Sequence, residues 1–478
     1  MIFNPVVFTQ GGGELDYDNM LPACAYENSE SLPNTFSTNV WAIGPRAFMS
    51  AICRTIQAPK CGYVGTSAFQ NSTLSSGYFP NVRCVDACAF AGTVALSVAD
   101  FPECKYVMDS AFSNSLASAF RFPKCEYVGA AAFSACGTMF SIDMPACSYV
   151  GSEAFRLCNN LTSISFPSVQ RIAISAFRGC KVSVVDLPMC SYIEAFAFIS
   201  NPVQTISLPN ISFLGNSVFA FCSLLSHLDI PVAAVGDGTF QNCSALRDAL
   251  LPSILAVYAS AFYSCRLLSY VSAPLAVRIG AGAFMNCPSL SAVYFPLCSE
   301  ILQSAFYSAG LSEANFPECS SVGAGAFGNC TQLRTISFPK CEVIYSAAFF
   351  ATGILAANFP SCGTVYSSAF KSCTALLTAS FPVASVVRND AFYSCTQLSS
   401  AVFPRLSYIY SSAFGNCLSL SYLLLTHSSK CTLSNSNAFT GTPLASGIGS
   451  IVVPSSIYYD YYNDTNWSWF RSVLTSVV

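Results

Sequence analysis

One phenylalanine recurs along almost the whole chain at a near-constant interval. Seventeen of the eighteen intervals in this series are 21 or 22 residues, and only the last is longer. We call its members the repeat Phe residues: Phe48, Phe69, Phe90, Phe112, Phe133, Phe155, Phe177, Phe198, Phe219, Phe240, Phe262, Phe284, Phe306, Phe327, Phe349, Phe370, Phe392, Phe414 and Phe439. Such a period is typical of a solenoid, in which each unit buries its apolar side chains against its neighbours. The chain is therefore predicted to present long, regular surfaces suited to binding.

The composition excludes two classes of protein. Hydrophobic residues make up 53% of the chain, but no stretch holds the roughly 20 consecutive apolar residues of a membrane-spanning helix. The net charge is −3, and the 21 basic residues are scattered singly, whereas nucleic-acid binding requires clustered Lys and Arg. We predict no membrane insertion and no nucleic-acid partner. The opening MIFNPVVFTQGGG lacks the regions of a signal peptide, which predicts a chain made in the cytoplasm.

Residues 161–180 show how one unit is built. They read LTSISFPSVQRIAISAFRGC, in which Ile164-Ser165-Phe166 alternate as in a short strand. Pro167 then ends the strand, because proline cannot donate to a continuing ladder. A proline precedes the repeat Phe by ten residues in sixteen units and by nine in one. The small residues before Phe177 predict a tight helical turn, with Phe177 and Cys180 facing the interior.

This unit pattern, L-x-x-I-x-F-P followed by V and then I-G-x-x-A-F-x-x-C, resembles the BspA-like class of leucine-rich repeat. Val64-Gly65-Thr66-Ser67-Ala68-Phe69 and Ile279-Gly280-Ala281-Gly282-Ala283-Phe284 carry its second half. The resemblance covers about Val40 to Phe439. It implies an α/β repeat: a right-handed leucine-rich-repeat solenoid with one long parallel sheet and about eighteen units of 21–22 residues. It also implies binding to protein or glycan partners at surfaces, although the units here are shorter and richer in proline and cysteine.

Three parts are predicted along the chain: residues 1–35 as an attachment or capping segment, residues 36–439 as the solenoid, and residues 440–478 as a C-terminal cap. The arrangement V-V-P-S-S…Y…T-N-W in the last part resembles the closing unit of BspA-like arrays. The opening MIFNPVV with its glycine run resembles the start of tail-associated proteins of phages that infect Gram-positive gut bacteria. This second resemblance implies attachment to other virion proteins through the N-terminal segment.

Most of the 25 cysteines fall into two columns of the repeat. Eleven lie three residues after the repeat Phe, and nine lie two residues after the repeat proline. Buried, reduced thiols are the favoured prediction, because a free cysteine behaves as a small hydrophobic residue. Disulfides between stacked units and a metal site are the alternatives. Cys84 and Cys88 are the one close pair, and a lone pair is weak evidence for zinc, so we predict no metal and no cofactor.

The sequence offers little that could catalyse a reaction. It contains no G-x-S-x-G, phosphate-binding loop or dinucleotide-binding turn. His227 and Asp229 are expected on one face of a strand, where they could form a general base. The simpler interpretation is an exposed histidine on a binding face. We predict no catalytic residue, with a glycan-active hydrolase using the aspartate column as a third class of function.

The outward positions of the predicted strands are the better candidate for function. Asp100, Asp143, Asp186 and Asp229 fall in every second unit, so they would lie roughly 10 Å apart. Such positions are also polar for solubility alone, and the alternation limits like-charge repulsion. The candidate binding residues are Tyr78, Asp100, Arg121, Asp143, Asp186, His227, Asp229, Asp248, Tyr270 and Tyr294. A further column, expected to form a stacked tyrosine edge or alternatively a binding stripe, comprises Tyr63, Tyr106, Tyr127, Tyr149, Tyr192 and Tyr408.

These features together predict a non-enzymatic recognition protein that binds a host-cell surface protein or glycan as a phage tail or other virion component. The alternative is a BspA-like adhesin on a bacterial cell surface. The sequence does not identify the ligand, the oligomeric state or the host.

Overall fold

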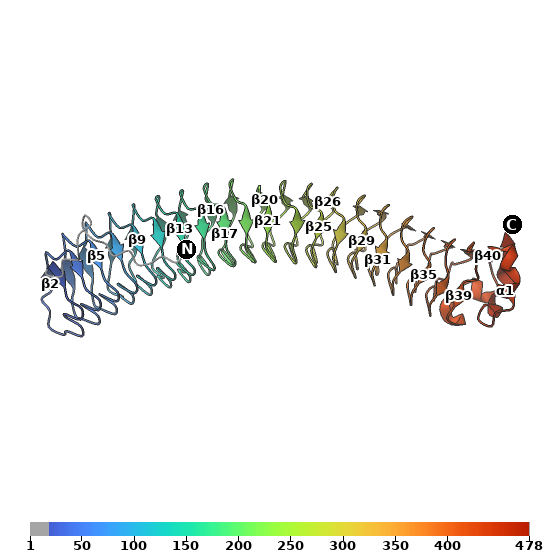
Figure 1. The fold of residues 1–478 in the computed structure, drawn as a ribbon, viewed down its shortest axis with the longest axis horizontal. Helices are drawn as coiled ribbons and strands as arrows, with labels where there is room; N and C mark the ends of the chain where they lie inside the picture. The colour runs from blue at the N-terminus through green and yellow to red at the C-terminus, as the bar shows by residue number, and fades with distance from the viewer. Residues whose placement is uncertain (1–18, 478) are drawn as a thin grey trace. The chain divides into compact units, whose positions relative to one another are not determined.

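Parallel strands stacked from coil to coil form the fold of residues 19–477, the part of the chain that the computed structural model describes. These residues belong to two compact units, Met1–Asn210 and Ile211–Val478, and each is described by itself. In both units the strands of successive coils lie side by side and pair in parallel (Figure 1). The solenoid prediction is confirmed. The predicted attachment segment at the N-terminus lies largely outside the described residues, and the three-part division stays a prediction.

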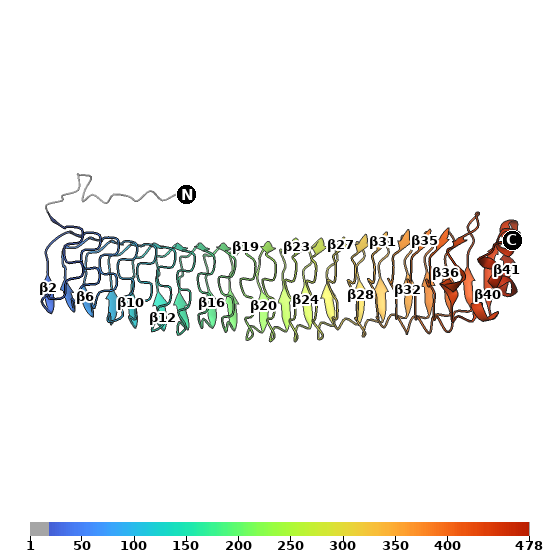
Figure 2. The same ribbon diagram turned by 90° about the horizontal axis from the view of Figure 1, so that it is seen from below.

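Each coil contributes two strands, and the strands of each kind form their own row (Figure 2). The three-residue strands of the first unit are β2 (Thr35–Ser37), β4 (Thr55–Gln57), β6 (Ser76–Tyr78), β8 (Val98–Asp100), β10 (Ala119–Arg121), β12 (Ser141–Asp143), β14 (Ser163–Ser165), β16 (Val184–Asp186) and β18 (Thr205–Ser207). Its two-residue strands are β1 (Met20–Leu21), β3 (Ala42–Ile43), β5 (Tyr63–Val64), β7 (Cys84–Val85), β9 (Tyr106–Val107), β11 (Tyr127–Val128), β13 (Tyr149–Val150), β15 (Arg171–Ile172) and β17 (Tyr192–Ile193).

The second unit repeats this plan. Its three-residue strands are β20 (His227–Asp229), β22 (Asp248–Leu250), β24 (Tyr270–Ser272), β26 (Ala292–Tyr294), β28 (Glu313–Asn315), β30 (Thr335–Ser337), β32 (Ala356–Asn358), β34 (Thr378–Ser380), β36 (Ser400–Val402) and β38 (Tyr422–Leu424). Its two-residue strands are β19 (Phe213–Leu214), β21 (Ala234–Val235), β23 (Ala256–Val257), β25 (Arg278–Ile279), β27 (Glu300–Ile301), β29 (Ser321–Val322), β31 (Val343–Ile344), β33 (Thr364–Val365), β35 (Val386–Val387), β37 (Tyr408–Ile409) and β39 (Thr432–Leu433). The row of two-residue strands is an addition to the single sheet that the sequence predicted.

The three-residue strands keep strict register, so each column of the repeat faces one way. Ile142 in β12 lies opposite Ile164 in β14, and Leu228 in β20 lies opposite Ala249 in β22. The central residue of each such strand points inward and its two neighbours point outward, as the period of two requires. A shift of one residue would expose the whole apolar set, so the register is strongly specified.

Hydrogen-bonded turns replace the helical turn expected before each repeat Phe. The N–H groups of Ser175 and Phe177 both donate to carbonyls of the next coil at 2.9 Å. Between them, the Ala176 N–H donates to the Ala173 carbonyl of its own coil at 3.4 Å, and after them the Arg178 N–H donates to the Ser175 carbonyl at 3.1 Å. Alternate amides therefore bond to the next coil, and the others bond locally. A helix would direct every amide within its own coil and could not form this third ladder.

This alternation requires left-handed backbone two residues before and two residues after the repeat Phe. The φ angles are +57° at Ser175 and +77° at Gly179, and +55° at Ser67 and +57° at Asn71 in an earlier coil. Left-handed backbone costs about 1–2 kcal/mol for a residue with a Cβ, and Asn and Gly tolerate it best. Small or polar residues hold most of these positions for that reason, and their presence reflects turns rather than a helix.

The helices that the structure describes in full lie near the C-terminal end of the chain. They are η3 (Ser436–Phe439), η4 (Leu444–Ser446), η5 (Ser455–Ile457), α1 (Tyr458–Tyr462) and η6 (Trp467–Val473), beside strands β40 (Ser450–Pro454) and β41 (Leu474–Val477). Phe439 ends the repeat Phe series here, with its ring 5.3 Å from that of Phe470. The Trp467 indole N–H donates to the Cys431 carbonyl at 2.8 Å. Within residues 19–477, no helix has the length and apolar character needed to cross a bilayer.

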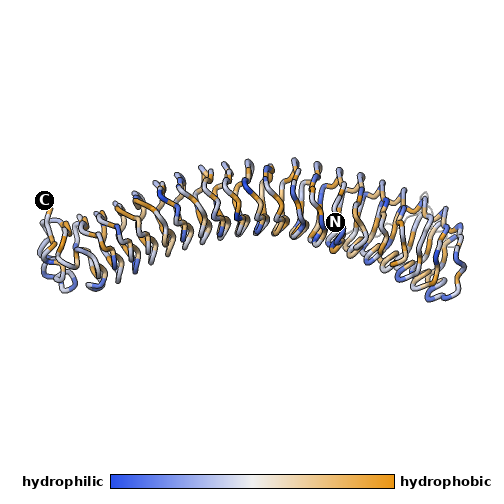
Figure 3. The backbone as a smooth tube through the Cα atoms, turned by 180° about the vertical axis from the view of Figure 1, so that it is seen from behind, coloured by the Kyte–Doolittle hydropathy of each residue, from blue (hydrophilic) through white to orange (hydrophobic). Residues whose placement is uncertain are grey.

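Stacked phenylalanine rings form the core of both units. Every repeat Phe is fully buried, which confirms the predicted inward orientation, and hydrophobic segments recur in each coil (Figure 3). In the second unit the Phe327 ring lies 5.2 Å from Phe306 and 5.3 Å from Phe349, nearly parallel to both. A second column, represented by Phe338, crosses it edge-on at 5.7 Å. These are the offset and edge-to-face arrangements that aromatic rings prefer.

Phe327→Ala is expected to lower the free energy of unfolding by about 3–5 kcal/mol, because it removes a buried ring and leaves a cavity. Chemical denaturation followed by circular dichroism measures the change. Ser337→Ala, at an exposed strand position of the next coil, is the control and should stay within about 0.5 kcal/mol of the parent protein. Equal stability of the two variants would contradict a core built on the repeat Phe residues.

Candidate binding surfaces

All ten predicted binding residues lie on three-residue strands, with exposed or half-buried side chains. The first unit carries Tyr78, Asp100, Arg121, Asp143 and Asp186, and the second carries His227, Asp229, Asp248, Tyr270 and Tyr294.

The five residues of the second unit come together on one four-stranded sheet, β20-β22-β24-β26. We call this set, His227, Asp229, Asp248, Tyr270 and Tyr294, the β20–β26 patch. His227 lies opposite Asp248, and Asp248 lies opposite Tyr270, so these three form one outward column. Tyr294 lies in the second outward column, and its side chain is 52% exposed. The patch thus combines two aromatic faces, two carboxylates and an imidazole on a hydrogen-bonded scaffold.

The partner of His227 differs from the one that the sequence suggested. His227 Nδ1 lies 2.7 Å from Asp248 Oδ2 in the neighbouring strand, and Asp229 is not the partner. The reason is geometric: facing residues on adjacent strands are about 4.8 Å apart, whereas residues two apart along one strand are separated by about 6.6 Å. An exposed ion pair of this kind contributes at most about 1 kcal/mol, so a ligand can replace it at low cost.

In the first unit, Asp100 and Arg121 lie opposite each other in β8 and β10. One carboxylate oxygen of Asp100 is buried without a hydrogen-bond partner. The other two acidic candidates of this unit each face a serine: Asp143 lies opposite Ser165, and Asp186 lies opposite Ser207. Like charges are therefore separated by a neutral strand, as expected for a column that avoids repulsion.

The second tyrosine column forms the first positions of two-residue strands. Tyr127 and Tyr149 stack with ring centroids 5.2 Å apart, and the Tyr63 hydroxyl donates to Asp86 Oδ2 at 2.5 Å. These half-buried rings are engaged with one another and with the protein. The contacts support a stacked tyrosine edge, which was the expected interpretation, over a binding stripe.

Sequence reasoning missed a row of aromatic residues on the turn segments of the second unit. From Phe262 to Phe414 the residue directly after the repeat Phe is aromatic in every second coil, and we call this set, Tyr263, Tyr307, Phe350 and Tyr393, the aromatic row. The intervening coils carry Met285, Gly328, Lys371 and Gly415 at the same position. The signal is a period of two units, which a comparison of single units does not reveal.

Contacts with the next coil hold the rings of the aromatic row in place. A Cβ on Gly328 would lie 2.8 Å from Tyr307 Cδ2, so the ring occupies space that only glycine leaves free. The Asn329 side-chain amide donates to the Tyr307 hydroxyl at 2.7 Å. Asn416 makes the same bond to Tyr393 at 2.9 Å, and Asn286 makes a longer one to Tyr263 at 3.4 Å.

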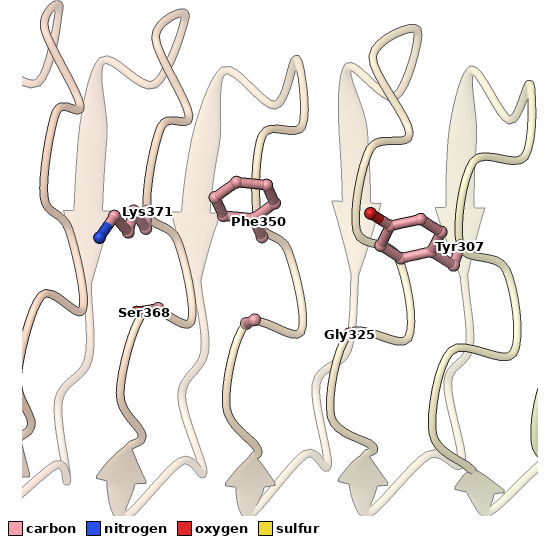
Figure 4. Close-up of a pocket in the computed structure, with 6 residues that line it drawn as sticks. Tyr307, Gly325, Phe350, Ser368 and Lys371 are labelled. Carbon is pink, nitrogen blue, oxygen red and sulfur yellow. The ribbon is translucent and has the colours of Figure 1, made fainter.

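A shallow hollow of about 530 Å³ lies along this row, between Tyr307 and Lys371. Figure 4 shows Tyr307, Phe350 and Lys371 in one line, with Gly325 and Ser368 in a second line beside it. The Lys371 ammonium group is engaged by Asp390 at 3.0 Å and lies over the Tyr393 ring at 4.9 Å. The hollow is therefore lined by flat apolar faces and small residues.

The cysteine columns are hydrogen-bonded ladders in the core. All 25 cysteines are free, and all but Cys24 and Cys88 are buried, as predicted. In the column after the repeat Phe, the Cys265 thiol donates to the Phe240 carbonyl of the preceding coil at 3.1 Å. Asn201 occupies the same column and donates to the Phe177 carbonyl at 2.9 Å. The column thus selects small side chains that can donate to a buried carbonyl.

Burial controls the chemistry of these thiols. It raises the pKa of Cys61 and of Cys287 to about 12 in each case. Because the thiolate is the reactive form and the metal ligand, these side chains are inert at neutral pH. Among residues 19–477, no group of three or more His, Cys, Asp or Glu side chains is placed to hold a metal ion.

Comparison with known proteins identifies a family whose sequence model matches most of the chain. The family model described as the BspA type leucine-rich repeat region, with six copies, matches residues 19–140, 148–269, 255–377 and 364–462. No curated protein matches the chain. Similar solved structures include a leucine-rich repeat protein from Bacteroides ovatus, with 21% identity over 78% of this chain and 91% of that chain and a TM-score of 0.49. Another is a leucine-rich cell surface protein from Faecalibacterium prausnitzii, with 19% identity over 92% and 98% of the two chains and a TM-score of 0.31.

Thiol labelling of the native protein at pH 8 should modify Cys24 and Cys88 alone, because the other thiols are buried and out of reach of the reagent. Labelling in denaturant without reductant should modify all 25. Mass spectrometry of the labelled peptides identifies the sites. Fewer than about half of the thiols reacting in denaturant would mean that disulfides link the coils.

Stability should fall at alkaline pH. Thiols of the unfolded chain ionise near pH 8.5, whereas buried thiols such as Cys287 ionise at about 12. The folded state therefore retains protons that the unfolded state loses, so the thiol contribution is complete below about pH 8.5 and is lost as pH rises toward 12. Urea unfolding midpoints should decrease steadily between pH 9 and pH 11, and Cys287→Ala should show a shallower decrease. A midpoint unchanged over this window would contradict the protonated ladders.

Proposed function

Since the chain belongs to the BspA-type leucine-rich repeat family, we propose that it is a non-enzymatic recognition protein that binds a protein or glycan on a cell surface. The main observation that supports this proposal is the β20–β26 patch. Tyrosine side chains are enriched at binding interfaces, where they bury a large area and retain a polar tip. Here Tyr270 and Tyr294 stand exposed beside His227 and Asp248 on strands whose backbone is already paired.

The first unit supports the same function with a second group of exposed residues. Tyr78 on β6 is 52% exposed, and Arg121 on β10 faces Asp100. Arginine and tyrosine are the residue types that most often dominate binding energy.

The geometry favours binding over catalysis. Catalysis needs a concave pocket in which a nucleophile, a base and an orienting group converge. The His227–Asp248 pair instead lies on an open strand face, with the histidine side chain 66% exposed. Water has free access to this pair, so it has no means of stabilising a transition state in a dry site.

We further propose the kind of particle on which the protein is displayed. The opening MIFNPVV and glycine run support a phage tail or other virion component, with attachment through residues outside the described part of the chain. A bacterial cell-surface adhesin is the alternative that the family suggests. Immunogold labelling separates the two settings: label on purified virions supports the first, and label on the cell envelope of uninfected bacteria supports the second.

Removing the aromatic side chains of the β20–β26 patch should abolish binding while leaving the fold intact. Tyr270→Ala combined with Tyr294→Ala is expected to weaken attachment to whole cells by at least tenfold, because anchors of this kind contribute more than about 1 kcal/mol each. Tyr78→Ala with Arg121→Ala tests the first unit in the same assay. The midpoint of thermal unfolding should be nearly unchanged for both pairs.

Thr335→Ala with Ser337→Ala is the matched control, since these residues occupy the same two outward positions on β30. Attachment at parental strength by both folded aromatic variants would place recognition away from the strand face. Loss of attachment in the control as well would show that outward strand positions act through the fold rather than through contact with a ligand.

A further inference from the structure

The aromatic row of the second unit is a separate surface from the β20–β26 patch. Its members follow the repeat Phe on the turn segments, whereas the patch lies on three-residue strands. The four rings are half-buried, so each keeps one part in solvent. Packing of the core does not require large aromatic residues at a repeated half-exposed position, so their presence points to a role in binding.

The spacing of the row is set by the coil. Neighbouring repeat Phe rings stack 5.2 Å and 5.3 Å apart around Phe327, so two coils advance the row by about 10 Å. Tyr307, Phe350 and Tyr393 thus follow one another at equal intervals, with Lys371 over the ring of the last. Equal intervals suit a polymeric ligand that offers the same flat face at the same repeat.

Each tyrosine platform is preorganised by the coil that follows it. Tyr307 lies against Gly328 and accepts a hydrogen bond from Asn329, and Tyr393 lies against Gly415 and accepts one from Asn416. Phe350 has no hydroxyl, and the coil after it carries Ser372 where the others carry asparagine. An asparagine side chain is thus present at this position in the coil after each tyrosine and absent there in the coil after Phe350. This pairing is expected if the sequence is under selection to fix the orientation of the tyrosine ring. Fixing a side chain before binding lowers the entropy cost of association.

The surroundings of the row are neutral and consist mainly of small residues. Small residues and the hydroxyl of Ser368 line the hollow between Tyr307 and Lys371. The lysine charge is balanced by Asp390. Hydroxyl groups both donate and accept hydrogen bonds, which matches a ligand that is itself covered with hydroxyls. A charged ligand would find no unpaired ion in this hollow.

We propose that the aromatic row binds an extended, neutral β-1,4-linked glycan, with sugar rings stacked on Tyr307 and Phe350, the two aromatic residues that line the hollow. In such a chain each sugar is rotated relative to the next, so every second sugar presents the same face. Its disaccharide repeat is of the same length as two coils. The apolar C–H face of a sugar ring packs on an aromatic face, while its equatorial hydroxyls reach the bordering hydrogen-bonding groups.

The competing occupant is a proline-rich peptide. A polyproline II helix repeats every three residues, at about 9 Å, and also docks on aromatic grooves. Its carbonyl oxygens need donors that point outward from the groove. Here one N–H of each of the Asn329 and Asn416 amides is used by a tyrosine hydroxyl, and the peptide repeat of about 9 Å is shorter than the advance of about 10 Å over two coils, which favours the glycan.

Isothermal titration of the full chain tests the proposal with four probes: cellohexaose, the hexamer of β-1,4-linked N-acetylglucosamine, maltohexaose and decaproline. At least one β-1,4-linked hexamer should bind, more tightly than its disaccharide, and maltohexaose and decaproline should not. Tyr307→Ala with Phe350→Ala should weaken binding at least tenfold. Gly328→Ala should also weaken it, because the new Cβ displaces the Tyr307 ring without removing an aromatic residue.

Tyr307→Phe and the patch variant Tyr270→Ala with Tyr294→Ala are the controls. The first keeps the platform and should lose much less affinity than the alanine change, and the second should bind the glycan as the parent does. Binding of decaproline alone, failure of all four probes, or glycan binding that survives the Tyr307 and Phe350 changes in a folded protein would each overturn the proposal. Loss of cell attachment in the patch variant with retained glycan binding would show that the two surfaces act independently.

Discussion

The architecture depends on satisfying every buried backbone amide within a coil of 21 or 22 residues that contains no helix. The three-residue and two-residue strands satisfy the amides of two segments by pairing with the next coil. The turn segment around the repeat Phe forms a third set of bonds between coils, in which alternate amides, such as those of Ser175 and Phe177, donate to the next coil. In that segment the carbonyl oxygen of the repeat Phe can accept a second hydrogen bond. The donor comes from the next coil and is a cysteine thiol in most coils or, at Asn201, a side-chain amide. The cysteine ladders are thus explained by the same requirement as the left-handed turns.

The buried columns of the repeat supply the stability of the fold, so the residues of the outward columns can be chosen for binding. Exposed strand residues such as Tyr294 contribute little to packing, and the in-register sheet repeats whatever they present at the spacing of the strands. The turn segments add a second spacing, since Gly328 and Gly415 make room for the preceding tyrosine rings. One scaffold can therefore display two independent surfaces without compromise of its core.

The sequence predicted the solenoid and its core well, because a strict Phe period leaves few other folds and the buried position of Phe327 follows from it. It was wrong about the turn: Ser175 and Ala176 are compatible with a helix, and the hydrogen bonds that decide against one come from residues twenty positions away. The partner of His227 was missed for a related reason, since cross-strand proximity outweighs proximity along the strand. The aromatic row escaped notice because Tyr307 and Gly328 hold the same position in successive coils, and only their alternation has meaning.

Residue-resolved hydrogen exchange across the Phe327 turn tests the central claim most directly. The account predicts that the Phe327 and Asn329 amides, which bond to the next coil at 2.7 and 2.8 Å, exchange as slowly as the amides of the neighbouring strand β30. The local bonds of Gly328 and Cys330 should give comparable protection, since opening any of them requires separation of packed coils. Exchange of the Phe327 and Asn329 amides at the rate of an exposed loop would contradict the third ladder and, with it, the explanation of the repeat.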